Sequence, residues 1–92
     1  MSSIRIDDGG EVSEVPLRGD RIVFGRLPEC DVVLSDSGIS REHAELVRVG
    51  AGWEVHDLDS RNGTFVNDAQ VERQRFGTGD VLRLGQIGRA HV

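Results

Sequence analysis

The chain has 92 residues, a formal net charge of −5 and a single cysteine, Cys30. This length accommodates one domain with a modest core and leaves no room for a second. One cysteine cannot close an intrachain disulfide, which fits a reducing, cytoplasmic compartment, and we expect Cys30 to be a small buried or half-buried apolar residue. All eleven basic residues are arginines and acidic residues outnumber them. We therefore expect no basic stripe for nucleic acid, and without about eighteen consecutive apolar residues no membrane span.

Short stretches of alternating apolar and polar residues recur along the chain and predict strands. In chain order the predicted strands are Ile4–Ile6, Val12–Leu17, Asp20–Phe24, Asp31–Leu34, Ala44–Val49, Trp53–Leu58, Thr64–Asn67 and Val81–Leu84. The segment Ile87–Val92 is a candidate for a final strand beside the first. Turn residues separate the strands, and no window sustains a helical period over three turns. This pattern predicts an all-β fold, either a sandwich or a barrel.

The aromatic residues are expected in the core of this fold. Trp53 alternates with Val55 on one side of its strand, which favours the core over a stacking platform for bases. Phe24, Phe65 and Phe76 are likewise predicted to be buried.

Polar segments interrupt the alternation at the ends of several predicted strands: Gly25-Arg26, Ser40 to His43, and Asp57 to Thr64. Because their small and polar residues favour turns, the hydrogen-bond donors in these segments can converge on one anion. The forked guanidinium of Arg26 can donate two parallel hydrogen bonds to phosphate, although an exposed loop arginine can also be merely solvated. The Ser40 hydroxyl can donate to phosphate, or it can simply close a turn through its own backbone.

Catalysis by Ser40 and His43 is disfavoured. The two residues are three positions apart near a strand start, where their side chains diverge, and no nucleophile-elbow sequence is present. A metal site that combines His43 with His56, Asp57 or Cys30 is also disfavoured, because zinc-like spacing is missing.

The run Asp57-x-Asp59-x-Arg61 superficially resembles a calcium loop but fails in detail. Arginine occupies the third ligand position, Asn62 replaces the required glycine, and Asp68 stands where a bidentate glutamate is needed. We expect instead that Asp57 and Asp59 tie down the turn before Asn62.

The ordered motifs together resemble the forkhead-associated (FHA) domain. They are Gly25-Arg26, Ser40-x-x-His43, Asn62-Gly63-Thr64-x-Val66-Asn67 and Gly79-Asp80-x-Leu82-x-Leu84-Gly85, within about residues 20–86. The resemblance implies a two-sheet β-sandwich of about ten or eleven short, mostly antiparallel strands. It also implies one FHA-type domain over residues 1–92, which we expect to be a module of a larger protein.

The resemblance further implies a role for each motif residue. Residues implied to contact a phosphopeptide are Arg26, Ser40, Arg41, Arg61 and Asn62, and those implied to support the site are Gly25, His43, Gly63 and Thr64. In this pattern Asn62 brackets the ligand backbone, because a carboxamide both donates and accepts hydrogen bonds. His43 is implied to be an inward-facing residue that holds the loops of Arg26 and Ser40.

The implied function is phosphothreonine-dependent protein binding in Ser/Thr kinase signalling, by a monomer without catalysis, cofactor or metal. The partner is a phosphothreonine-containing protein, and neither nucleic acid nor a membrane is expected to bind this chain. The alternative is an interaction or structural module that works independently of phosphorylation.

Overall fold

The computed structural model describes residues 3–8, 11–17, 19–34, 38–77 and 79–85. All the regular structure in these ranges is β-strand, which confirms the all-β prediction. The strands are β1 (Ser3–Asp8), β2 (Glu11–Pro16), β3 (Arg21–Gly25), β4 (Val32–Val33), β5 (Ala44–Val49), β6 (Gly52–Asp57), β7 (Thr64–Val66), β8 (Ala69–Val71), β9 (Arg73–Phe76) and β10 (Val81–Leu84). Within these ranges there is no helix long and apolar enough to cross a membrane.

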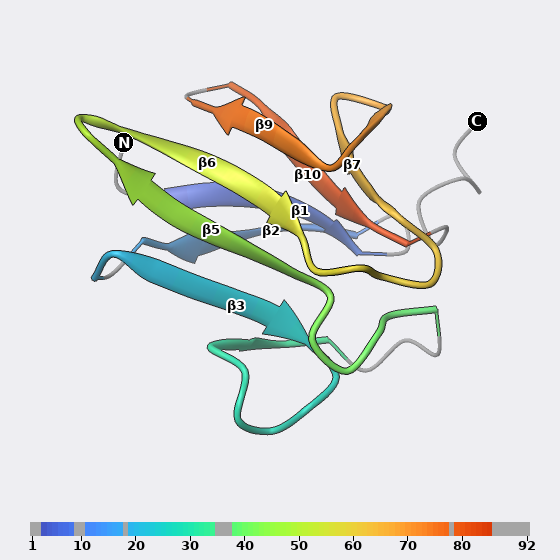
Figure 1. The fold of residues 1–92 in the computed structure, drawn as a ribbon. Coiled ribbons are helices and arrows are strands. Elements are labelled where there is room, and N and C mark those ends of the chain that lie inside the picture. The colour runs from blue at the N-terminus through green and yellow to red at the C-terminus, as the bar shows by residue number, and fades with distance from the viewer. Residues whose placement is uncertain (1–2, 9–10, 18, 35–37, 78, 86–92) are drawn as a thin grey trace.

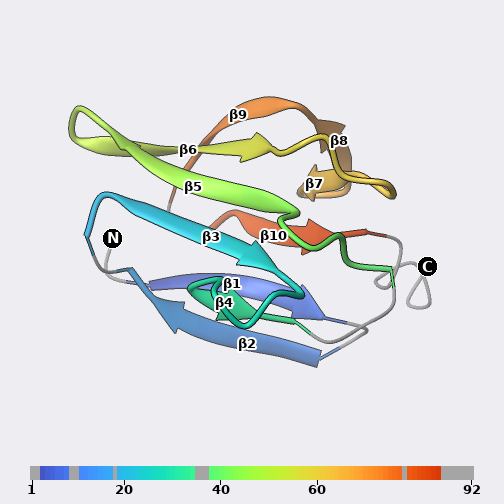
Figure 2. The same ribbon diagram turned by 60° about the horizontal axis from the view of Figure 1, so that its bottom comes forward.

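The strands form two five-stranded sheets, in the orders β2-β1-β10-β7-β8 and β4-β3-β5-β6-β9. The sheets lie over one another as two layers (Figure 1, Figure 2). Among the described strands, the pairs β1–β10 and β3–β4 are parallel and the others are antiparallel. The two-sheet sandwich that the FHA resemblance implied is therefore confirmed.

All eight strands predicted from internal alternation are present, and β5 and β10 have the predicted bounds. The sequence did not predict β8 and β9, which each lie at the edge of a sheet. Strand β8 is only three residues long and β9 is polar apart from Phe76, and most of their side chains are exposed, so the apolar alternation that marks a half-buried strand is missing. The candidate strand Ile87–Val92 lies outside the described residues.

The core fills the space between the sheets with side chains from both layers. Its largest fully buried apolar members are Phe24, Ile39, Leu46, Leu82, Leu84 and Val55. Trp53 and Phe76 are also buried, as predicted, and Cys30 is a free, buried thiol whose pKa is raised by burial.

The prediction that Phe65 lies in the core is wrong. Thr64 and Val66 are the buried residues of β7, so the side chain between them projects from the outer face of the sheet. There the Arg83 guanidinium stacks 4.4 Å from the centre of the Phe65 ring.

One end of the sandwich gathers the polar loops. The register aligns the end of β3 with the start of β5 and the end of β6, through Phe24, Ala44 and Asp57. The β4–β5 and β6–β7 connections consequently meet there, at the right of Figure 1, and the β3–β4 connection begins beside them and lies at the bottom of the view.

Candidate functional site

Backbone hydrogen bonds join the β3–β4 and β4–β5 loops. The N–H of Arg26 donates to the carbonyl of Ser40 at 3.2 Å, and the N–H of Leu27 donates to the carbonyl of Arg41 at 3.3 Å. The exposed Arg26 side chain also donates through Nε to the carbonyl of Ile39 at 2.6 Å. This bond directs the guanidinium and leaves its two Nη groups as a fork for a ligand.

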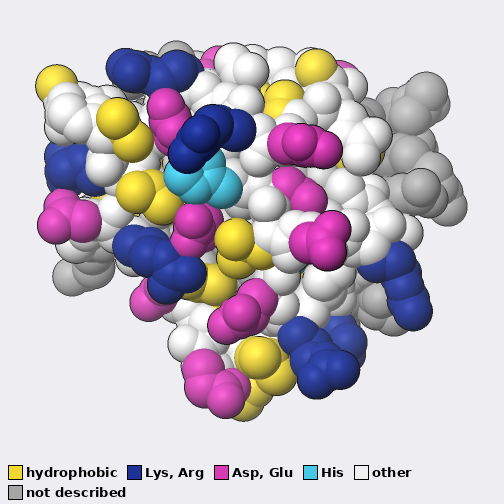
Figure 3. Space-filling model, viewed as in Figure 1, with side chains coloured by type: hydrophobic (Ala, Val, Ile, Leu, Met, Phe, Trp, Pro, Cys, Tyr) yellow, Lys and Arg dark blue, Asp and Glu magenta, His cyan; other side chains and the backbone are white. Residues whose placement is uncertain are grey.

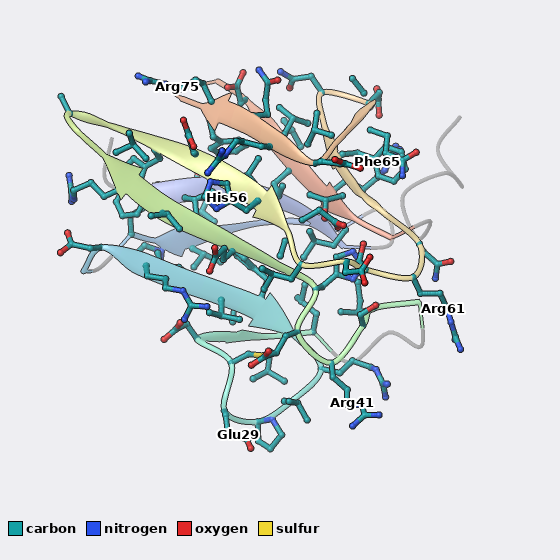
Figure 4. The ribbon with its side chains drawn as sticks, viewed as in Figure 1. Glu29, Arg41, His56, Arg61, Phe65 and Arg75 are labelled. Carbon is teal, nitrogen blue, oxygen red and sulfur yellow. The ribbon has the colours of Figure 1, made fainter. Side chains whose placement is uncertain are left out.

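The β6–β7 loop joins the same cluster. Its Arg61 N–H donates to Ser40 Oγ at 2.9 Å, and Asn62 Nδ2 donates to the carbonyl of Gly38 at 2.9 Å. Because Ser40 Oγ accepts a bond from the protein, its own proton can be donated outward. The exposed side chains of Arg41 and Arg61 both extend away from the loop end in Figure 4.

Gly25 is required by a close approach between loops. A Cβ atom there would lie 2.0 Å from the carbonyl oxygen of Arg41 and 2.9 Å from Cys30 Sγ. Only glycine allows the strand carrying Arg26 to pass this close to the loop carrying Ser40.

His43 is fully buried beneath the loops. The Ser40 N–H donates to its Nδ1 at 3.0 Å, so the neutral ring carries its proton on Nε2, which donates to the carbonyl of Gly63 at 2.7 Å. Burial lowers the pKa of His43 and thereby favours this neutral form. His43 therefore connects two of the loops, and both of its ring nitrogens are engaged by backbone groups.

This geometry also disfavours catalysis by Ser40 and His43. A general base must face the nucleophile, yet His43 bonds the backbone of Ser40 and the Ser40 hydroxyl oxygen accepts from Arg61. In the part of the chain that the structure describes, no three His, Cys, Asp or Glu side chains are grouped to hold a metal ion.

Asp57 fixes the β6–β7 loop from inside. Its carboxylate accepts from the Ser60 N–H at 3.1 Å, from the Ser60 hydroxyl, and from the fully buried Thr64 hydroxyl at 2.6 Å. Burial alone would raise the pKa of Asp57, but the bonds from Ser60 and Thr64 outweigh it and hold the pKa below its usual range. Asp59 was expected to share this role, but it is exposed and has no bond to any described residue.

Sequence reasoning missed Ser60. Its hydroxyl donates to Asp57 and accepts from the Gly63 N–H at 3.0 Å, so it links the start and the end of the loop. A serine three positions after an aspartate at a strand end is a recognisable turn signal, and it was available in the sequence.

The arginines differ in their ion pairing. Four of those over the strands pair with carboxylates: Arg21 with Glu45, Arg48 with Asp20, Arg73 with Glu54 and Arg83 with Asp68. Among the side chains that the structure describes, the arginines without an acidic partner are Arg75 on β9 and, together at the loop end, Arg26, Arg41 and Arg61. Basic side chains lie at the lower right of the surface in Figure 3, and mixed charges surround the histidine over the strands. The loop end thus carries three arginines that no ion pair occupies, together with directed donors, which suits an anion.

Comparison with known proteins agrees with this site. The FHA domain family model matches residues 22–85. The FHA domain-containing protein FhaA of Mycobacterium tuberculosis is 37% identical over 83 residues, which cover 90% of this chain and 16% of that protein. The chain spans less than a fifth of the length of FhaA and of each of two further curated relatives that it matches.

Solved structures share the fold. The FhaA FHA domain complexed with the intracellular domain of Rv3910 superposes with a TM-score of 0.77 at 37% identity, covering 90% of each chain. An FHA structure from work on phosphothreonine-dependent FHA domain interactions gives a TM-score of 0.73 at 36% identity, covering 90% of this chain and 84% of the other.

Proposed function

The chain belongs to the FHA-domain family, and we propose that it is a phosphorylation-dependent interaction module that binds phosphothreonine-containing segments of other proteins. The observation that carries this proposal is the group of unpaired arginines, Arg26, Arg41 and Arg61, at a loop end where the Ser40 hydroxyl can also donate. The module binds without chemistry, because His43 is held by backbone groups and offers Ser40 no base.

Recognition divides between charge and geometry. The Nη groups of Arg26, the Ser40 hydroxyl and Arg41 bind the phosphate oxygens, which carry nearly two negative charges at neutral pH. Arg61 and Asn62 contact the extended ligand beside the phosphate, and Asn62 keeps one amide hydrogen and its oxygen for the ligand backbone. A short surface site of this kind supports low micromolar binding, about −8 kcal/mol.

Titration with phosphothreonine peptides and their dephosphorylated copies tests the proposal by calorimetry. Binding should require the phosphate, and Ser40→Ala should weaken it. Arg26→Ala should also weaken it, whereas Arg75→Ala should not, because Arg75 is an exposed arginine on β9 away from the loop end (Figure 4). Equal binding of the dephosphorylated peptides would favour the alternative, an interaction module that works independently of phosphorylation.

The cellular setting follows from the same proposal. The domain acts as a monomer. It is a module within a larger protein, because curated relatives extend far beyond the matched region. A reducing, cytoplasmic compartment fits a free buried cysteine and a partner phosphorylated by Ser/Thr kinases.

A further inference from the structure

The carboxylate of Asp57 joins the two ends of the β6–β7 loop. At the start of the loop it accepts from the Ser60 backbone and hydroxyl, and at the end it accepts from the Thr64 hydroxyl. Ser60 Oγ in turn accepts from the Gly63 N–H at 3.0 Å. The loop tip, Arg61 and Asn62, is therefore enclosed by bonds that lead back to one half-buried carboxylate.

We propose that Asp57 is a positioning residue for phosphopeptide binding, which raises affinity for an anion although it adds negative charge near the site. The inference rests on the proposed function, since Arg61 and Asn62 are the groups that Asp57 would position. Asp57 does not touch the ligand, because both carboxylate oxygens are occupied inside the loop.

Both oxygens of the ionised carboxyl group act as acceptors in this network. An asparagine oxygen can still accept from the Ser60 N–H, but its NH2 group cannot accept, so the Ser60 and Thr64 hydroxyls would have to turn their protons away and accept instead. Asp57→Asn therefore replaces charge-assisted bonds by weaker neutral ones with almost no change in side-chain volume.

Asp59 provides a matched control two residues away. It is exposed and has no hydrogen bond to a described residue, so Asp59→Asn removes the same charge without touching the loop network. Its φ of 58° also tolerates asparagine well. Coulomb's law predicts that loss of either negative charge leaves phosphate binding unchanged or makes it tighter. If Asp57 positions the loop, Asp57→Asn alone should bind the phosphopeptide more weakly than wild type.

The experiment compares both variants with the wild-type domain, first by titration with one phosphothreonine peptide at 0.15 M salt. Asp57→Asn should bind about tenfold more weakly, the effect of losing one charge-assisted hydrogen bond, and Asp59→Asn should bind as tightly as wild type or more tightly. If Asp57→Asn binds like Asp59→Asn, the positioning role is overturned.

A second measurement does not depend on the ligand. Hydrogen exchange of the Ser60 and Gly63 amides in the free domain should accelerate in Asp57→Asn and stay unchanged in Asp59→Asn, while amides of the central strand β5 keep their protection. Equal acceleration in β5 would mean that Asp57 only stabilises the fold, and it would overturn the proposal. If the wild type binds no phosphopeptide, the proposed function fails, and the exchange data still decide whether Asp57 fixes the loop.

Ser60→Ala covers the case in which Asp57→Asn does not fold. It keeps the charge of Asp57 but removes the hydroxyl that connects Asp57 to the Gly63 N–H. Binding should weaken in this variant too. Where Asp57→Asn does fold, the double variant should bind no more weakly than Asp57→Asn, because both changes break one chain of bonds. Undiminished binding by Ser60→Ala, or fully additive effects, would contradict the inference.

Discussion

Gly25→Ala tests whether the close approach of two loops creates the phosphate site. The added Cβ would lie 2.0 Å from the Arg41 carbonyl oxygen, whereas real Cβ contacts are essentially never shorter than 3.0 Å. Strand β3 and the β4–β5 loop must therefore separate by about 1 Å or more. That carbonyl accepts from the Leu27 N–H at 3.3 Å and from the Cys30 thiol at 3.4 Å, so the shift breaks contacts on both loops.

The expected magnitude has two parts. Overpacking of this kind costs about 1–3 kcal/mol of unfolding free energy, and each kcal/mol lowers the Tm of a domain this size by about 4–8 °C. Separating Arg26 from Ser40 and Arg41 also removes at least one charge-assisted bond to phosphate, which lowers affinity about tenfold to a hundredfold.

Thermal unfolding and peptide titration measure the two parts separately. Gly77→Ala is the matched control, because an added Cβ there meets nothing within 4 Å. The control should bind like wild type and be up to about 1 kcal/mol more stable, since alanine restricts the unfolded chain. A Gly25→Ala domain that melts with wild type and binds within twofold of it would refute the packing argument.

Three further predictions concern the arginine, the histidine and the ligand. Arg26→Ala should weaken phosphopeptide binding by about 1.5–3 kcal/mol without unfolding the domain. Arg26→Lys should restore little of the affinity, because a lysine cannot donate to the Ile39 carbonyl and also present two parallel donors to phosphate. Titration of both variants checks this, and full affinity in Arg26→Lys would count against the two-donor fork. Because the pKa of His43 is lowered in the folded state, the ring stabilises the fold fully above about pH 6.5, and this stability is lost as the pH falls below that value, where protonated Nδ1 would face the Ser40 N–H. Urea unfolding at several pH values should show this loss of unfolding free energy in wild type and in the control His56→Gln. A profile that does not change with pH would contradict a buried neutral ring. A phosphothreonine peptide should bind more tightly than a phosphoserine peptide by about 0.8 kcal/mol, the effect of one buried methyl group, and an aspartate peptide should bind worst. Affinity for both phosphopeptides should rise from about pH 5 to pH 7 as the phosphate gains its second charge. Calorimetry on three matched peptides tests the order, and comparable binding of the aspartate peptide would exclude phosphate recognition.

The sequence predicted the strands that carry apolar side chains, and some of these have one buried face. Strands β5 and β6 alternate between buried and half-buried or exposed positions, and this contrast is visible as an apolar period of two. Strand β9 buries only its last residue, Phe76, so neighbour pairing rather than local composition makes it a strand. Such edge strands depend on contacts with residues far away in the chain, which a local pattern does not contain.

Phe65 shows that residue type is weaker evidence than position. Phenylalanine is usually buried, but the register of β7 assigns the core face to Thr64 and Val66. The buried Thr64 hydroxyl has a partner in Asp57, which makes a polar residue tolerable in the core. Period-two alternation places Thr64 and Val66 on one face and Phe65 and Asn67 on the other, but it does not say which face is buried.

At the site, the order of motifs located the loops but not the bonds between them. Spacing alone could not reveal that Asn62 reaches Gly38, or that Ser60 and not Asp59 completes the network of Asp57. These contacts depend on how strands β5 and β6 align the loop ends, and that alignment is set by the whole sheet.

The acidic composition and the anion site are compatible because charge pairing is local. Exposed charges farther apart than about 8–10 Å are largely screened at physiological salt, so the net charge of −5 has little effect within a pocket. Over the strands each paired arginine meets a carboxylate, as Arg21 meets Glu45, whereas the half-buried carboxylate of the loop end, Asp57, directs its oxygens to hydroxyl and backbone donors of the loop. The attraction that the unpaired arginines of the loop end exert on an anion is therefore short in range and directional. It suits one phosphate on a protein segment, while the acidic remainder of the surface opposes an extended polyanion.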